Sequence, residues 1–141
     1  MTRSEQRRAA VFALYQHDLS RRPLAETLPK DATPFVRALA EATAEHEAEL
    51  DAALARHSRG WSVERIAPLE RAIMRVALLE LYHPDAVPGE QPIPAEGAID
   101  EAVESAKRFC SAETPAFVNG VLAAALDELR KNAKTIDAPE Q

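Results

Sequence analysis

The chain has 141 residues, of which 46% are hydrophobic and 5% aromatic, enough for one domain with a sizeable core of Leu, Val, Ile and Ala. Cys110 is its only cysteine, which excludes an intrachain disulfide and a cysteine-based zinc site. No stretch reaches the ~18 apolar residues of a membrane span and the N-terminus lacks the features of a secretory signal, so we expect a cytoplasmic protein that does not bind membranes.

The charge of the chain is unevenly distributed. The net charge is −6, which argues against a generic nucleic-acid binder. Residues 1–22 nevertheless hold five arginines against two carboxylates, a net charge of +3, so the remainder carries −9. This asymmetry indicates two binding surfaces with opposite preferences, although chance asymmetry on a solvated surface is an equal alternative from charge alone.

The first two predicted helices have clear start signals. Thr2 and Glu5 fit a capping box, so a helix is expected over residues 2–19, followed by a polar linker between two prolines. Thr33 is a predicted N-cap with Pro34 at the first helical position. From there apolar residues recur every three or four positions, which predicts one long helix ending at Gly60.

The second half of the chain is also predicted to be helical. A short helical turn is expected over residues 62–66, and residues 68–83 form a strong helix whose broad apolar band places it at the centre. A helix with small contact residues follows Pro94, and the last helix begins near Thr114. Residues 133–141 are expected to be a polar, disordered tail beyond a single domain over residues 1–132.

Asn119 and Gly120 present a conflict between local signals. Asn-Gly between apolar residues is typical of a β-hairpin, but a hairpin needs alternating strands on both sides. Here the apolar residues continue through the glycine at helical spacing, so a helix is favoured. Because a glycine inside a helix costs about 1 kcal/mol relative to alanine, we expect a helix crossing with no room for a Cβ.

No catalytic or metal-binding pattern stands out. The closest metal-like spacing is His46-x-x-Glu49, but di-iron bundles use Glu-x-x-His twice, so a solvated helix face is favoured and no metal is predicted. Cys110 is interpreted as a small buried hydrophobe. With four glycines and no phosphate-binding loop, the sequence predicts neither a cofactor nor an enzyme.

Three arginines in the N-terminal segment favour a ligand. Arg3, Arg7 and Arg8 lie at the start of the first helix, where positive charge opposes the helix dipole. Guanidinium groups pair with phosphate and stack on bases, so RNA is a candidate ligand. An ordinary charged terminus is the alternative.

Three stretches together resemble a known family: RRAAVFALY (7–15), LERAIMRVALLEL (69–81), and AIDEAVESAKRF (98–109) continuing to FVNGVL (117–122). In this order and spacing they resemble the bacterial transcription antitermination factor NusB family. The resemblance implies an all-α fold of about six to seven helices, arranged as two small antiparallel bundles packed together. It implies no enzymatic activity.

The resemblance also implies partners. Members of the family bind boxA, a short single-stranded element of nascent ribosomal RNA, together with a small-subunit ribosomal protein that is also transcription factor NusE. The complex joins RNA polymerase with other Nus factors, and some relatives self-associate, so a homodimer is possible. A helical adapter without RNA binding and an accessory module for an RNA methyltransferase remain alternatives.

Site residues follow from the resemblance by position. Those expected near RNA are Arg3, Arg7, Arg8, Glu113 and Phe117, the last with a core position as its alternative. Those expected to face the basic ribosomal protein are Tyr15 and Glu70. Those with a structural role are Asn119 and Gly120. Because three arginines supply few phosphate contacts, we expect weak boxA binding alone and tighter binding with the partner.

Overall fold

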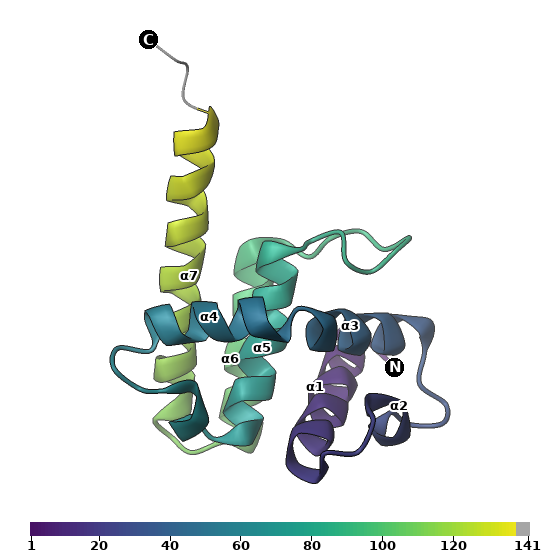
Figure 1. Ribbon diagram of the computed structural model, residues 1–141. Coiled ribbons are helices and arrows are strands. Elements are labelled where there is room, and N and C mark those ends of the chain that lie inside the picture. The colour runs from purple at the N-terminus through teal and green to yellow at the C-terminus, as the bar shows by residue number, and fades with distance from the viewer. Residues whose placement is uncertain (138–141) are drawn as a thin grey trace.

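The computed structural model describes the backbone of residues 1–137 and the side chains through Lys134, and this part of the chain is helical without strands (Figure 1). It contains seven α-helices and one 3₁₀ turn, η1. In chain order they are α1 (Arg3–Ser20), α2 (Leu24–Thr27), α3 (Pro34–Glu45), α4 (Glu47–His57), η1 (Val63–Arg65), α5 (Pro68–Tyr82), α6 (Ala95–Phe109) and α7 (Thr114–Asp137). The all-α prediction is confirmed.

Two helix starts form as their cap residues predict. The Thr2 hydroxyl accepts the Glu5 N–H at 3.1 Å and donates to the Glu5 carboxylate at 3.2 Å, a side-chain closure of the first turn of α1. The Thr33 hydroxyl accepts the Val36 N–H at 3.2 Å, with Pro34 as the first residue of α3. These caps satisfy backbone donors that the helices themselves leave without partners.

Helix α5 is the centre of the molecule, as its apolar band predicts. Eight consecutive residues, Ala72 to Leu79, are buried, and α5 contacts α1, α3, α4, α6 and α7. Helices α3 and α4 run almost end to end across the other helices (Figure 1), so that α3 packs on α1 while α4 packs on α7. The chain therefore forms an N-terminal group, α1–α3, and a second group, α4 with α6 and α7, and both groups pack against α5.

One polar residue within α5 is also buried. Arg75 is 11% exposed at its side chain and donates to both carboxylate oxygens of Asp51 on α4, at 2.7 and 2.9 Å. Glu47 and Asp18 lie 3.4 and 3.7 Å from the same guanidinium. Because a buried guanidinium is tolerated only with partners, this cluster fixes α4 and α1 against one side of α5.

The prediction of a single helix from Thr33 to Gly60 is wrong, because the helix is interrupted at His46. His46 leaves helical geometry, with φ −98° and ψ 14°, and separates α3 from α4. Its imidazole Nδ1 lies 2.9 Å from the Ala42 carbonyl oxygen, which also accepts the His46 N–H at 3.1 Å. A side chain that bonds its own preceding turn competes with the regular helix ladder, and periodicity alone does not reveal it.

Two other boundaries differ from the sequence expectation. The linker after α1 contains the short helix α2, whose next residue, Leu28, is buried. Helix α7 extends to Asp137, so residues 133–137 of the expected tail are helical, and residues 138–141 lie outside the described part of the chain.

The expected helix crossing at Gly120 is also wrong. Asn119 and Gly120 are exposed on α7, and a Cβ built on Gly120 would meet no heavy atom within 4 Å. Among the described residues Asn119 makes no side-chain hydrogen bond, so it does not bridge two helices. The packing around position 120 therefore does not explain why a glycine occurs there.

We predict that Gly120→Ala stabilises the fold by about 0.5–1 kcal/mol, because alanine restricts the unfolded chain and fits the helix without a clash. Urea unfolding followed by circular dichroism measures the change. Gly97→Ala is the matched comparison on α6, where the added Cβ would lie 3.2 Å from Ile93 Cγ1 and the gain should be smaller. A loss of stability in Gly120→Ala would contradict this prediction and support the close helix crossing expected from the sequence.

Candidate nucleic-acid and partner interface

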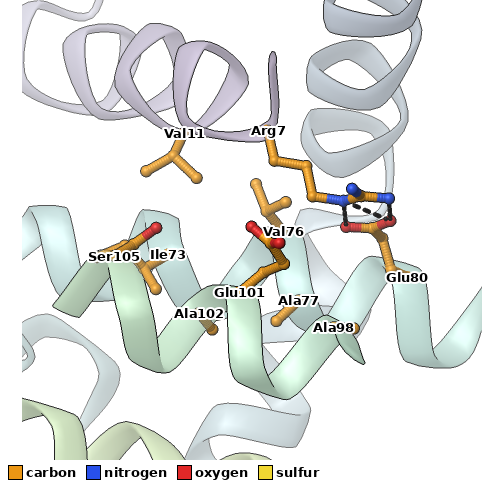
Figure 2. Close-up of a pocket in the computed structure, with 10 residues that line it drawn as sticks. All are labelled: Arg7, Val11, Ile73, Val76, Ala77, Glu80, Ala98, Glu101, Ala102 and Ser105. Carbon is orange, nitrogen blue, oxygen red and sulfur yellow. Dashed lines mark hydrogen bonds and ion pairs between the residues drawn. The ribbon is translucent and has the colours of Figure 1, made fainter. Parts of the chain in front are cut away.

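Arg7 is engaged inside the protein. From α1 it donates Nε and Nη2 to the Glu80 carboxylate on α5 at 3.0–3.2 Å, and both side chains are only 12% exposed. Figure 2 shows this pair beside a cavity between α1, α5 and α6, about 20 Å³ in volume, enough for one water. Burial raises the pKa of the Glu80 carboxyl, and the bonds from Arg7 oppose that rise.

In this structure Arg7 is paired with Glu80 and mostly buried, so its expected contact with RNA stays a prediction that requires this pair to open. Glu80 occupies Nε and Nη2, and because the Arg7 side chain is only 12% exposed, a phosphate has little access to the remaining N–H groups while the pair is closed. The sequence gives no sign of this, because Glu80 lies 73 residues away along the chain.

Arg3 and Arg8 differ from Arg7 and from each other. Arg3 lies over the Phe35 ring, 4.2 Å from its centroid, and bonds Gln6 at 3.1 Å and Glu90 in the loop before α6. Its side chain is 45% exposed, so these surface contacts are weak. Arg8 is half-buried and makes no ion pair within the described part of the chain, which leaves its guanidinium available.

An aromatic groove lies between the end of α4 and the first turns of α7. It has a volume of about 420 Å³ and is lined by Trp61, Phe117 and Gly120, with Arg59 at its edge. Trp61 is 54% exposed, unusual for the only tryptophan of the chain. Phe117 packs against the core and also lines the groove, and its contact with RNA stays a prediction.

The turn before Trp61 explains its projection into solvent. Arg59 and Gly60 both have positive φ, 50° and 88°, which reverses the chain after α4. The buried Ser58 hydroxyl donates to the Trp61 carbonyl oxygen at 2.7 Å and closes the turn. The chain is thus fixed on both sides of an exposed indole, a feature that sequence reasoning missed.

A second exposed apolar surface lies on α1 and the end of α6. Phe12 and Phe109 contact edge to face, with ring centroids 5.0 Å apart, and Phe109 is 44% exposed. Leu19 is also exposed near the end of α1. Helical periodicity does not reveal this surface, because it does not show which part of an apolar face is covered.

Tyr15 and Glu70 lie on adjoining segments. Arg71 donates to Asp18 at 2.8 Å and holds the last turns of α1, where Tyr15 is half-buried, beside the first turn of α5. The Glu70 carboxylate accepts the Thr114 hydroxyl at 2.8 Å, linking α5 to the start of α7. Glu113, just before Thr114, is exposed.

Cys110 has the environment of an inert thiol. It is half-buried next to α6, and burial raises the pKa of its thiol, with Glu70 acting in the same direction. A raised pKa lowers the thiolate fraction and so the nucleophilicity. Within the described part of the chain, no helix has both the length and the hydropathy to cross a membrane.

The comparisons with known proteins agree with this architecture. The model of the NusB family matches residues 4–127. Transcription antitermination protein NusB of Geobacillus kaustophilus (strain HTA426) is 38% identical over 136 residues, which cover 93% of this chain and 100% of the relative. The chain belongs to the NusB family. This membership confirms the resemblance seen in the sequence, and with it a role in transcription antitermination that is not enzymatic.

Solved NusB structures share the fold. T. maritima NusB matches with a TM-score of 0.77 and 31% identity, over 91% of this chain and 92% of that one. A crystal structure of antitermination factors NusB and NusE in complex with dsRNA matches with a TM-score of 0.74 and 24% identity, over 91% and 99%. The helical arrangement of this NusB-family chain is thus also found in experimental structures.

The two neighbouring arginines of α1 should respond differently to removal. Arg7→Ala leaves the buried Glu80 carboxylate without its partner and should destabilise the fold by roughly 3 kcal/mol. Arg8→Ala should change stability by less than about 0.5 kcal/mol. Urea unfolding of both variants tests this. Equal, small losses would show that the Arg7–Glu80 pair is not formed in solution.

Proposed function

We propose that this chain binds the boxA element of nascent ribosomal RNA together with NusE, and that the complex joins RNA polymerase with other Nus factors in the cytoplasm. Three kinds of observation support the proposal. They are the family membership, the solved NusB–NusE complex that shares the fold, and an exposed aromatic groove suited to unstacked bases. The groove is the observation that carries the RNA part of the proposal.

The groove fits single-stranded RNA better than a duplex. Bases of a single strand stack on aromatic side chains regardless of sequence, and Trp61 and Phe117 offer two such rings. Arg59, exposed at the edge, supplies a charge for the adjoining phosphate. Gly120 leaves the wall of the groove without a side chain, which provides room for a flat ring.

Three more residues extend the proposed RNA surface. Arg8 has a guanidinium without an ion pair in the described chain, and Arg3 has only surface contacts that a phosphate can replace. Glu113 precedes α7, close in sequence to Phe117, and its exposed carboxylate can accept a hydrogen bond from a base amino group. Few free arginines on an acidic protein favour weak binding alone and tighter binding with a basic partner.

We assign NusE to the surface formed by α1 and the starts of α5 and α7. Tyr15 and Glu70 lie there, and the exposed Phe109, in contact with the partly buried Phe12 of α1, supplies apolar area. Aromatic side chains in the centre of an interface with charges around them are typical of protein–protein contacts. A homodimer that uses the same aromatic pair would compete with NusE.

Two exposed aromatic residues should separate the two binding activities. Trp61→Ala should weaken boxA binding about 5- to 160-fold, since one stacked base contributes about 1–3 kcal/mol, and leave NusE binding intact. Phe109→Ala should weaken NusE binding and leave the RNA contact of the groove intact. Fluorescence polarisation with boxA and scrambled RNA, with and without NusE, measures both.

The outcomes separate the alternatives. Quenching of the single tryptophan by boxA in the unmodified chain gives an independent readout of stacking, since Trp61 is the only indole. NusE binding without any boxA preference would support the helical adapter instead. Equal boxA affinity with and without NusE would contradict the cooperative part of the proposal.

The charge of Glu70 is testable without loss of its structural bond. Glu70→Gln keeps an acceptor for the Thr114 hydroxyl but removes the charge, so NusE binding should weaken by roughly tenfold while helicity is unchanged. Glu70→Lys should weaken it further. Calorimetric titration with NusE measures both variants, and an unaltered affinity in Glu70→Gln would remove Glu70 from the interface.

A further inference from the structure

Three metal-ligating side chains from different segments converge near the α3–α4 junction. They are His46 at the junction, Glu49 in the first turn of α4, and His83 directly after α5. One ligand atom from each of the three lies within 4.8 Å of the other two. The sequence offered only the pair His46 and Glu49, and folding adds the third group from 34 residues beyond Glu49.

The distances are close to those of a tetrahedral site. His83 Nε2 lies 2.9 and 3.2 Å from the two Glu49 carboxylate oxygens. In a tetrahedral site, zinc bonds of about 2.0–2.1 Å place neighbouring ligand atoms about 3.3 Å apart. The separation between His83 Nε2 and the Glu49 carboxylate is already close to that value. The His46 and His83 rings are adjacent, with centroids 4.1 Å apart, so the third potential ligand lies beside the other two.

The surroundings of His46 orient it for coordination. Its Nδ1 lies 2.9 Å from the Ala42 carbonyl oxygen, so Nδ1 carries the proton and donates, which leaves Nε2 with a free lone pair. A backbone carbonyl in this position is the usual outer partner of a metal-bound histidine, since it fixes both tautomer and ring orientation. The break in the helix at His46 and the tautomer needed for a metal thus have the same cause.

We propose that His46, Glu49 and His83 form a binding site for a divalent transition-metal ion, with zinc as the best match. Two imidazoles and a carboxylate suit zinc, whereas magnesium and calcium prefer sets of oxygen ligands. Glu49 is half-exposed and His83 is 33% exposed at its side chain, so the fourth position is open to water. A bound ion would join the α3–α4 junction to the end of α5.

The site faces a segment that contacts the N-terminus of α1. The loop that begins at His83 leads to Glu90, which bonds Arg3. An ion that fixes His83 would restrict the start of this loop. Metal binding would then influence the α1 end of the proposed RNA surface, although the metal site itself does not depend on that function.

The test uses the full chain without an affinity tag. Calorimetric titration with zinc chloride should give one site per chain, and His46→Gln and His83→Gln should each weaken it by about tenfold or more. His57→Gln is the matched control, because His57 also lies beside a carboxylate, Glu128 at 3.4 Å, but among the described residues no third metal-ligating group joins them. Magnesium should produce no binding. Retained zinc affinity in both ligand variants would overturn the proposal.

A spectroscopic measurement keeps the test independent of variant folding. X-ray absorption of the zinc-loaded, unmodified chain should show two imidazole ligands at about 2.0 Å and no sulfur. A sulfur shell at about 2.3 Å would identify Cys110 as the ligand instead and overturn the proposal. The absence of saturable zinc binding to the unmodified chain would also overturn the proposal.

Discussion

Buried charge pairs on α5 determine how the other helices are arranged around it. A helix that is covered on nearly all sides can keep a charged side chain only where a neighbour supplies the opposite charge. Arg75 meets Asp51 of α4 at 2.7 Å, and Glu80 meets Arg7 of α1 at 3.0 Å. Contacts among Leu, Val and Ala are non-directional, so these two pairs supply the specificity that an aliphatic core lacks.

The Arg7–Glu80 pair has a consequence for recognition. It takes one arginine out of an already small positive cluster, and the body of the protein is acidic. Fewer phosphate contacts mean less non-specific attraction and a weaker dependence of affinity on salt. Under the proposed function, RNA binding then rests on stacking, which does not depend on sequence, and on a partner protein.

Much of the fold could be predicted because its signals are local. Thr2 and Thr33 each cap a helix through a hydrogen bond to a backbone N–H three residues further on. The apolar band of residues 68–83 indicates a helix that is covered on several sides. The site could be predicted only in part, because its features depend on contacts distant in sequence. The hydrophobic periodicity of the sequence reveals neither the pairing of Arg7 with Glu80 nor the approach of His83 to Glu49. The exposure of Trp61 depends on a turn whose geometry is set by Arg59 and Gly60.

Gly120 shows how a wrong structural expectation can indicate a site. A glycine inside a helix is unfavourable, and the expected compensation was a close crossing, but the space beside Gly120 is open. Local rules that fail without a packing reason are most often broken at functional positions. Gly120 lies on the wall of the groove that Trp61 and Phe117 also line, where a side chain would occupy the space for a base. Under the proposed function, the unfavourable helix residue and the exposed tryptophan have one explanation, an open groove that accepts a flat base.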